Sequence, residues 1–220
     1  MSDRSRKPFL VVGLGRFGEA VARSLDRMGH EVLGIDNDPR QVEALAPALT
    51  QTIEADATDM DVLKRLGVDD FAAAVVAIGS DMEASILTVL ALSDLGLPRI
   101  WAKAVTENHG RILERTGATD IVFPEARMGE RVAHIMSGRM MDYIEFDDGF
   151  AIAKMSAPAF VAGKSLEESG VRTRHDITVV GVKRPNEDFE YARPETTVDQ
   201  GDLLIISGTR TQVECFVALQ

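Results

Sequence analysis

The stretch that decides the fold reads Val11-Val12-Gly13-Leu14-Gly15-Arg16-Phe17-Gly18. It begins in a short apolar run, residues 9–12, which predicts a buried strand, and it leads into residues 17–28, which have helical periodicity. A second predicted strand, residues 31–35, ends next to Asp36. The glycines follow the spacing G-x-G-x-x-G. A strand, a glycine turn, a helix, a strand and an acid in this order form the context in which that spacing indicates dinucleotide binding.

Each glycine of the motif has a separate expected role. Gly13 permits a tight turn, Gly15 lets the backbone approach a phosphate, and Gly18 lets the helix pack closely on the strand. The helix N-terminus then offers N–H groups and a positive dipole end to an anion. Asp36, followed by Asn37, is placed to accept hydrogen bonds from a ribose diol. Because a carboxylate repels a 2′-phosphate, NADPH is disfavoured as the ligand.

Two further segments follow predicted strands and are candidates for an adenine pocket. Asp56-Ala57-Thr58 comes after the predicted strand at residues 51–54, and Ala77-Ile78-Gly79 comes at the end of the one at residues 72–78. The carboxyl ends of parallel strands share one edge of a sheet, where ligands of this fold bind. For Asp56, an ordinary turn acid is an equal alternative.

Two charged residues are candidates for contacts near the phosphates. Arg16 lies inside the glycine loop, where its planar guanidinium can reach a phosphate of its own nucleotide or of a neighbouring subunit's. The alternative is a solvated surface arginine. Glu125 opens a predicted helix, where the helix dipole favours an acid. It is also a candidate metal ligand, for Mg²⁺ or Ca²⁺ beside a phosphate.

The composition of the 220 residues limits the function classes. The net charge of −11 argues against nucleic acid and against an anionic membrane as direct partners. No run approaches the ~18 apolar residues of a membrane span, so no membrane insertion is expected. One cysteine, Cys215, excludes an internal disulfide and suits a reducing cytoplasm. Its apolar neighbours predict a buried thiol.

The alternation of strands and helices over residues 8–120 predicts an α/β fold, a doubly wound parallel sheet of the Rossmann type. The predicted strands are residues 9–12, 31–35, 51–54, 72–78, 99–104 and 120–123, and the helices between them are residues 17–28, 39–46, 59–66, 80–95 and 107–116. Thr58 or Asp59 is expected to cap the helix at residues 59–66, and Ser80 or Asp81 the helix at residues 80–95.

The pattern changes after Pro124. A long helix is predicted at residues 125–141, with an apolar face of Val132, Ile135, Met136, Met140 and Met141. Strands at residues 143–156, 178–183 and 203–207 and a closing helix at residues 209–219 predict a small α+β lobe, with turn signals at residues 147–149, 185–186 and 200–202. The chain is therefore expected to divide into residues 1–140 and residues 141–220.

The second lobe carries no pairing of side chains typical of hydride transfer, and the sequence offers no general acid with an obvious orienting partner. We therefore expect a binding protein and not an enzyme, with no catalytic residues. A small NAD(H)-dependent oxidoreductase is the alternative from another class. A redox-sensing transcriptional regulator fits less well, because no basic helix-turn-helix segment is evident.

Five segments together resemble the cytosolic regulatory subunits of the Ktr and Trk potassium uptake systems, which consist of an RCK domain, the regulator of potassium conductance. They are Val11–Gly18, Arg27-Met28-Gly29-His30-Glu31-Val32, Ala77-Ile78-Gly79, Ile100-Trp101-Ala102-Lys103 and Pro124-Glu125-x-x-Met128-Gly129. The resemblance extends over nearly the whole chain. It adds Phe17 and Lys103 to the expected nucleotide-binding residues.

The resemblance implies a homo-oligomer built from dimers, an octameric ring, docked on the cytoplasmic side of a membrane potassium-translocating subunit. It implies that ATP and ADP favour different ring shapes and so set the activity of the pore, with NAD(H) as another candidate ligand. Arg16 matches an arginine that reaches the terminal phosphate across the dimer, and Asp36 matches the ribose acid. Glu125 matches a carboxylate that helps to hold Mg²⁺, Ca²⁺ or Na⁺.

The resemblance also raises cyclic di-AMP as a ligand of the C-terminal lobe, because some family members bind it there. Leu166, Val171, Arg172 and Thr178 fall in the comparable stretch. Glu167 stands where an apolar residue is usual, and this departure counts against that ligand.

Overall fold

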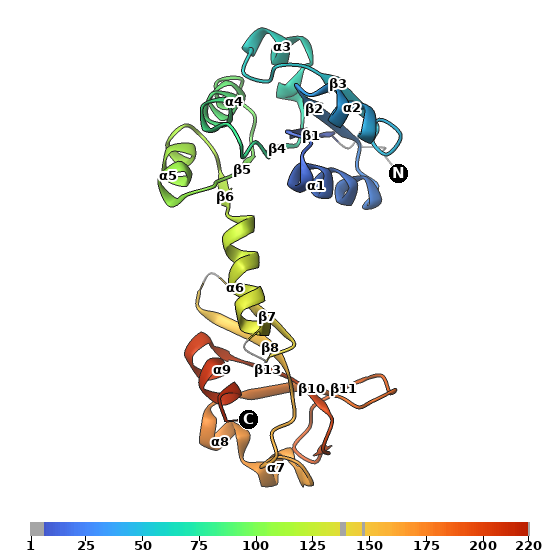
Figure 1. Ribbon diagram of the computed structural model, residues 1–220, viewed down its shortest axis with the longest axis vertical. Helices are drawn as coiled ribbons and strands as arrows, with labels where there is room; N and C mark the ends of the chain where they lie inside the picture. Colours follow the sequence, from blue (N-terminus) through green and yellow to red (C-terminus); the bar gives the residue numbers. More distant parts are fainter. Residues whose placement is uncertain (1–6, 137–139, 147, 220) are drawn as a thin grey trace, which may run out of the picture. The chain divides into compact units, whose positions relative to one another are not determined.

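The computed structural model describes residues 7–136, 140–146 and 148–219. The chain forms two compact units that divide between Glu125 and Ala126 (Figure 1). Each unit has its own hydrophobic core. The domain boundary predicted from the sequence, between residues 1–140 and residues 141–220, stays a prediction.

The first unit is built on a six-stranded parallel sheet in the order β3-β2-β1-β4-β5-β6. Its strands are β1 (Phe9–Val12), β2 (Val32–Asp36), β3 (Gln51–Glu54), β4 (Ala73–Val76), β5 (Ile100–Lys103) and β6 (Asp120–Val122). This order is that of the doubly wound dinucleotide-binding fold. The fold class predicted from the sequence is confirmed.

The helices of the first unit cover the two faces of the sheet. They are α1 (Arg16–Arg27), α2 (Pro39–Leu45), α3 (Met60–Arg65), α4 (Met82–Asp94) and α5 (Glu107–Arg115), with a short 3₁₀ helix at Val68–Asp70. Helices α1 and α2 pack over the face that carries Val11 and Val32, while the larger core on the opposite face includes Leu63, Leu92 and Leu113 from α3, α4 and α5.

Four of these helices begin at a side-chain cap. Asp38 accepts a hydrogen bond from the N–H of Arg40, Asp59 from that of Asp61, Asp81 from that of Ala84, and Thr106 from that of His109. Each cap satisfies a backbone N–H that the helix itself leaves unpaired. Between the alternatives left open by the sequence, the structure selects Asp59 over Thr58 and Asp81 over Ser80.

One part of the sheet surface stays uncovered by these helices. The helices on the Val11 face contact β1, β2 and β3. Across the sheet on the same face, Val11 is in register with Val75, and Val75 with Trp101. Trp101 lies on β5, flanked by strands on both sides, and still exposes 42% of its surface. A large aromatic side chain on such a strand is normally buried.

The second unit contains a five-stranded antiparallel sheet in the order β11-β10-β13-β8-β7 and a two-stranded pair, β12-β9. The strands are β7 (Asp142–Glu145), β8 (Phe150–Ser156), β9 (Lys164–Ser165), β10 (Thr178–Lys183), β11 (Phe189–Tyr191), β12 (Thr197–Val198) and β13 (Leu203–Thr209). The helices are α7 (Leu166–Ser169), α8 (Val171–His175) and α9 (Arg210–Val217).

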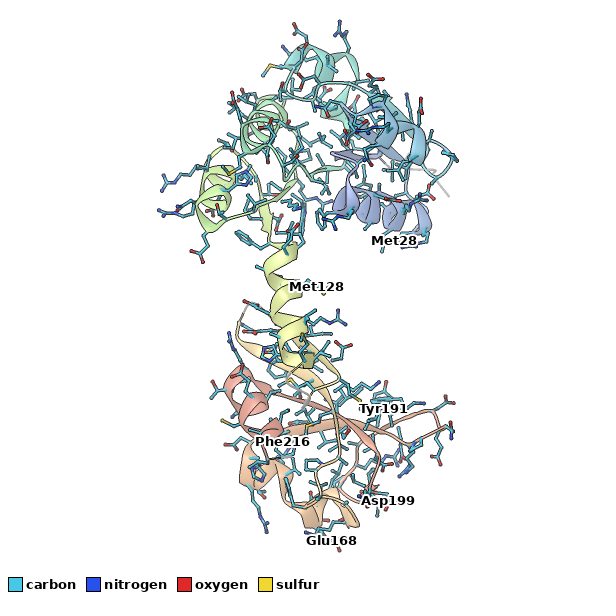
Figure 2. The ribbon with its side chains drawn as sticks, viewed as in Figure 1. Met28, Met128, Glu168, Tyr191, Asp199 and Phe216 are labelled. Atoms are coloured by element: carbon cyan, nitrogen blue, oxygen red, sulfur yellow. The ribbon has the colours of Figure 1, made fainter. Side chains whose placement is uncertain are left out.

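The core of this unit lies between one face of its sheet and α9. Along β8 the residues Ala151, Ala153 and Met155 point inward at every second position, as a half-buried strand requires. Phe216 on α9 closes this core and is 1% exposed (Figure 2). The α+β class predicted for the lobe is confirmed. The stretch predicted as a strand at residues 143–156 is a hairpin of β7 and β8, with Gly149 at a positive φ of 77° in the predicted turn. Residue 147 of that turn lies outside the described residues.

Helix α6 (Pro124–Met136) is shorter than the predicted helix at residues 125–141. Residues 137–139 lie outside the described residues. The prediction was wrong for two residues of its apolar face. Met140 is buried in the core of the second unit, and the N–H of Met141 donates to the carbonyl of Lys154 on β8. The predicted helix included Met140 and Met141 because apolar residues that follow a helix can match its periodicity by chance.

The cysteine prediction was also wrong. Cys215 is exposed on α9, while Val213, Phe216 and Val217 are buried. At about 100° per residue, position 215 lies away from the face that the other three share.

The first testable prediction concerns Gly18, which sets the contact between α1 and β1. A Cβ at Gly18 would lie 1.8 Å from the carbonyl oxygen of Gly13. Backbone cannot move aside as a flexible side chain can, so we expect Gly18→Ala to destabilise the protein by about 1–3 kcal/mol, the range for overpacked sites. Urea unfolding followed by circular dichroism measures this.

The matched control is Gly129→Ala on α6, where a Cβ would meet nothing within 4 Å. There the substitution should stabilise by roughly 0.5–1 kcal/mol, because alanine favours the helix. Equal unfolding midpoints for Gly18→Ala and the wild type would contradict the close contact.

Candidate functional site

The glycine loop joins β1 to α1 in a tight turn. Gly13 has a φ of +88°, and its N–H donates to the carbonyl of Ile35 on β2 at 2.8 Å. A Cβ at Gly13 would lie 3.2 Å from backbone atoms of Ala77 and Ile78. Gly15 is different, because nothing lies within 4 Å of the place where its Cβ would be. The backbone at Gly15 is therefore open to close approach by a ligand.

The first turn of α1 lacks the side-chain cap that α2 to α5 have. Its N-cap residue is Gly15, and no side chain in the described part of the chain caps the helix with a hydrogen bond. Unpaired N–H groups and the positive end of the helix dipole together make a binding site for an anion. A phosphate would supply the acceptors that Asp38, Asp59, Asp81 and Thr106 supply to the other helices.

Asp36 ends β2 beside this loop, and its carboxylate already accepts two backbone hydrogen bonds. Its Oδ2 accepts from the N–H of Leu14 at 2.6 Å, and its Oδ1 accepts from the N–H of Asp38 at 2.8 Å. Asp36 therefore shapes the glycine loop, and its contact with a ribose stays a prediction. A carboxylate has about four acceptor positions, so a ribose diol can still bind there. Asn37, which follows, is exposed.

Asp56 lies in a turn after β3, where its Oδ1 accepts from both the N–H and the hydroxyl of Thr58. These two hydrogen bonds lower the pKa of the Asp56 carboxyl. Ala57 is buried in the core of the first unit. In this structure Asp56 is therefore an ordinary turn acid, which is one of the two alternatives that the sequence left open. The contact of Asp56-Ala57-Thr58 with an adenine base stays a prediction.

The segment after β4 forms the other wall of the glycine loop. The N–H of Ala77 donates to the carbonyl of Val12 at 2.7 Å, which places Ala77 and Ile78 against Gly13. Gly79 follows, and a Cβ there would lie 2.9 Å from Nζ of Lys103. The sequence predicted that Ala77, Ile78 and Gly79 lie at the same edge of the sheet as the glycine loop, and the structure confirms this position. Their contact with a nucleotide stays a prediction.

Lys103 and Glu125 form an ion pair at this edge of the sheet. Lys103 ends β5 and Glu125 lies in the first turn of α6, and their Nζ and Oε1 atoms are 2.6 Å apart. The lysine side chain is only 12% exposed and the glutamate is 68% exposed. The Lys103 Nζ also lies 5.9 Å from the centre of the Phe17 ring in the first turn of α1. The hydrogen bond from Lys103 lowers the pKa of the Glu125 carboxyl, and the charge of Arg16 adds to this lowering.

The sequence identified both residues of this pair but not the pairing. Strand ends and helix starts meet at one edge of a parallel sheet, and this rule could have predicted it. Four residues expected to bind the nucleotide are thus near one another: Arg16 and Phe17 at the start of α1, Lys103 and Glu125. These residues offer few ligands for a metal ion. Among the described residues there is no group of three His, Cys, Asp or Glu that could hold a metal ion.

The stretch proposed for cyclic di-AMP lies on α7, α8 and β10. A guanidinium nitrogen of Arg172 donates to the hydroxyl of Thr178 at 3.0 Å. Val171 is 2% exposed in the core, and Leu166 packs against that core. Arg172 and Thr178 are therefore held together, whereas Val171 faces away from solvent.

No helix within the described residues is both long and apolar enough to cross a membrane. The chain matches the TrkA-N domain over residues 9–124 and the TrkA-C domain over residues 151–219. It is 36% identical over 217 residues to Ktr system potassium uptake protein A of Bacillus subtilis, covering 98% of each chain. It is 36% identical to Ktr system potassium uptake protein C of the same organism, covering 96% of each, and 33% identical to protein A of Vibrio alginolyticus, covering 94% of each.

Solved structures of other proteins have the same fold as this chain. The RCK domain of GsuK superimposes with a TM-score of 0.67 at 22% identity, and the GsuK channel bound to NAD with a TM-score of 0.68 at 22% identity. Each match covers 100% of this chain but only 48% and 40% of the solved chains, so this chain spans less than half their length. The chain has the RCK fold, and it belongs to the family of TrkA-N and TrkA-C domain proteins that includes the Ktr system potassium uptake proteins A and C.

Proposed function

We propose that this protein is a nucleotide-sensing regulatory subunit of a membrane potassium-translocating protein, bound to that partner on the cytoplasmic face of the membrane. The names of its relatives support the link to potassium uptake. One solved channel with the same fold is bound to NAD, which supports a nucleotide as the signal. The role is one of binding and not of catalysis.

The observation that carries the nucleotide site is the open N-terminus of α1. Gly15 leaves the backbone open, no side chain caps the helix, and the ammonium group of Lys103 lies near the same turn. These features favour an anionic phosphate chain. Asp36 at the end of β2 favours a nucleotide with an unmodified ribose. ATP, ADP and NAD(H) all meet these requirements, and calorimetric titration with each distinguishes among them.

ATP and ADP are the pair that suits a switch, because they differ by one phosphate. A ligand shifts a conformational equilibrium only by its differential affinity for the two states. The contacts that tell the two nucleotides apart must therefore lie at the terminal phosphate. Arg16 is exposed at the start of α1 and is the candidate for this contact, within its own chain or across to a second one.

The cation that the family resemblance implies, Mg²⁺, Ca²⁺ or Na⁺, is less well supported. Glu125 is the candidate ligand, and its carboxylate is already paired with Lys103. A single chain thus offers one carboxylate, next to a positive charge. A cation at Glu125 would therefore need further oxygen ligands from the nucleotide or from a second subunit.

A second copy of this chain is the proposed partner of α6. None of the described residues of α6 is buried, and Figure 2 shows Met128 on this helix. The apolar side chains of Met128, Val132, Ile135 and Met136 are exposed. The exposed sheet face at Trp101, which the described helices of the first unit leave uncovered, is a second apolar surface. Exposed apolar surface of this kind marks an interface. We propose a dimer-based homo-oligomer, with the octameric ring of the family as its full form.

The second prediction tests the phosphate contact. We expect Arg16→Ala to weaken ATP binding by about tenfold or more, within the ~1.5–3 kcal/mol range for a charged hydrogen bond, and to change AMP binding far less. Isothermal titration calorimetry with both nucleotides measures this. Arg23→Ala, further along α1 and paired with Glu19, is the control. Equal losses for ATP and AMP would show that Arg16 acts only on the structure of the loop.

The third prediction tests the assembly. At micromolar concentration the protein should have a mass well above the 23.9 kDa of one chain. Val132→Glu should shift the mass towards the monomer, because it places a charge on the apolar face of α6. Met28→Glu alters an exposed apolar side chain at the end of α1, away from α6 in the sequence, and should leave the mass unchanged. Light scattering coupled to gel filtration gives the masses, and a wild-type monomer would contradict the interface.

The fourth prediction tests the switch. We expect the assembly to adopt different shapes with ATP and with ADP, because the two nucleotides differ at the terminal phosphate that Arg16 is proposed to contact. A free-energy coupling of about 1–3 kcal/mol between nucleotide binding and shape is typical of allosteric proteins. Arg16→Ala and Glu125→Gln should each remove the difference. Small-angle X-ray scattering of the full assembly with each nucleotide measures it. Superimposable curves for the wild type would leave a nucleotide-binding scaffold without a switch.

A further inference from the structure

His109 is a buried histidine in the first turn of α5. It is 2% exposed, and the described part of the chain offers its Nε2 atom no hydrogen-bond partner. Its other ring nitrogen is engaged, because Nδ1 accepts a hydrogen bond from the N–H of Val105 at 3.4 Å. A ring nitrogen that accepts a hydrogen bond carries no proton, so the imidazole is neutral, with its proton on Nε2.

The backbone of His109 makes a second hydrogen bond to the same turn. Its N–H donates to the hydroxyl of Thr106, the N-cap of α5, at 3.1 Å. The ring therefore holds Val105 while the backbone holds Thr106, and one residue closes the turn between β5 and α5 in two ways. The next residue, Gly110, lies against Phe123, since a Cβ at Gly110 would come within 2.7 Å of that ring. The start of α5 is thus closely packed.

The surroundings of the imidazole are uncharged on their buried side. Helix α5 packs against α4, β5 and β6, and the buried face of α4 presents Ser85, Thr88 and Val89. Burial is the cause that lowers the pKa of His109. The charged groups on these elements are exposed or half-buried: Asp81 at the cap of α4, Glu83 and Asp94 on α4, Lys103 on β5, Asp120 on β6, and Glu107, Arg111, Glu114 and Arg115 on α5 itself.

Protonation of Nδ1 would destabilise this arrangement for three reasons. It would set a donor against the N–H of Val105, where the folded chain has an acceptor. It would also bury a charge among groups that do not compensate it. Finally, it would place that charge near the positive end of the α5 dipole. None of these costs applies to the unfolded chain, which therefore binds the proton more readily.

We propose that His109 makes the turn between β5 and α5 sensitive to pH: the turn is closed while the imidazole is neutral and opens when the imidazole is protonated. Opening releases the cap at Thr106 and the packing of Gly110 on Phe123. Because the unfolded state binds the additional proton, the stability of the first unit rises with pH. The contribution of His109 is complete above about pH 6.5, the ordinary pKa of histidine, and is lost as the pH falls below that value.

The test follows urea unfolding of the full chain at about pH 8 and about pH 5.5, where most carboxylates stay ionised. The single tryptophan, Trp101 on β5, reports unfolding of the first unit by its fluorescence. His109→Asn keeps a side-chain acceptor but cannot take up a proton. Between the two pH values, the folding equilibrium constant of the wild type should fall by up to about tenfold more than that of the variant, the limit for one histidine that protonates only when unfolded.

The matched control is His30→Asn in the same unit. The His30 ring is half-buried and lies edge-on to Phe9, and its replacement should leave the pH dependence of the wild type unchanged. If His109→Asn does not fold, His109→Gln takes its place. Equal losses in the wild type and the His109 variant overturn the inference, as does an equal relief of the loss in His30→Asn.

A second measurement needs no stability difference. The imidazole ¹³Cε1 resonance that disappears from the spectrum of the His109 variant identifies this ring in the wild type. In the folded wild type it should keep its neutral position at about pH 6, below the ordinary pKa of histidine. A resonance at the protonated position in the folded protein overturns the inference.

Discussion

The contact between Gly18 and the carbonyl of Gly13 is the constraint on which the first unit depends. A Cβ at Gly18 would lie 1.8 Å from that oxygen, so only glycine lets α1 start so close to β1. The close start places the N–H groups of the first turn at the carboxyl edge of the sheet, where β4 and β5 also end. The hydrogen bond from Leu14 to Asp36 then fixes the loop against β2. Packing at one glycine thus determines where an anion can bind.

The proposed site places the cationic side chains of Arg16 and Lys103 near the first turn of α1, in a protein whose net charge is −11. The overall charge repels a nucleotide at a distance, and salt screens that repulsion beyond about 8 Å at physiological ionic strength. At close range the helix dipole, Arg16 and Lys103 act over a few ångströms and in a partly desolvated place, where screening is weak. Binding to this protein therefore depends on local complementarity and not on long-range attraction. This arrangement favours selectivity for the ligand over speed of capture.

The parts of the structure that could be predicted from sequence are those set by local pattern. The glycine spacing, the apolar strands and the caps at Asp38, Asp59 and Asp81 each follow from a few neighbouring residues. The short elements β9, β12 and α7 were not predicted, because two to four residues show no period.

The details that could not be predicted at the site depend on contacts between residues distant in the sequence. Leu14 and Asp36 are 22 positions apart, as are Lys103 and Glu125. Their residue types suggested a site, but a pattern in one segment cannot specify which groups pair. The exposure of Trp101 has the same origin, since it depends on which helices cover which strands.

Helix α6 begins in the first unit and continues into the second as one continuous backbone. Its first turn contains Glu125, which Lys103 holds in the first unit. Its later residues belong to the second unit, where Arg131 pairs with Asp142 at 2.9 Å and the His134 ring lies 4.2 Å from that of Tyr143. Helix α6 therefore has a charged contact near each end, at Glu125 to β5 and at Arg131 to β7. Each of these ion pairs joins residues that are at least 11 positions apart in the sequence, so the ends of α6 are set by tertiary contacts and not by the helical pattern alone.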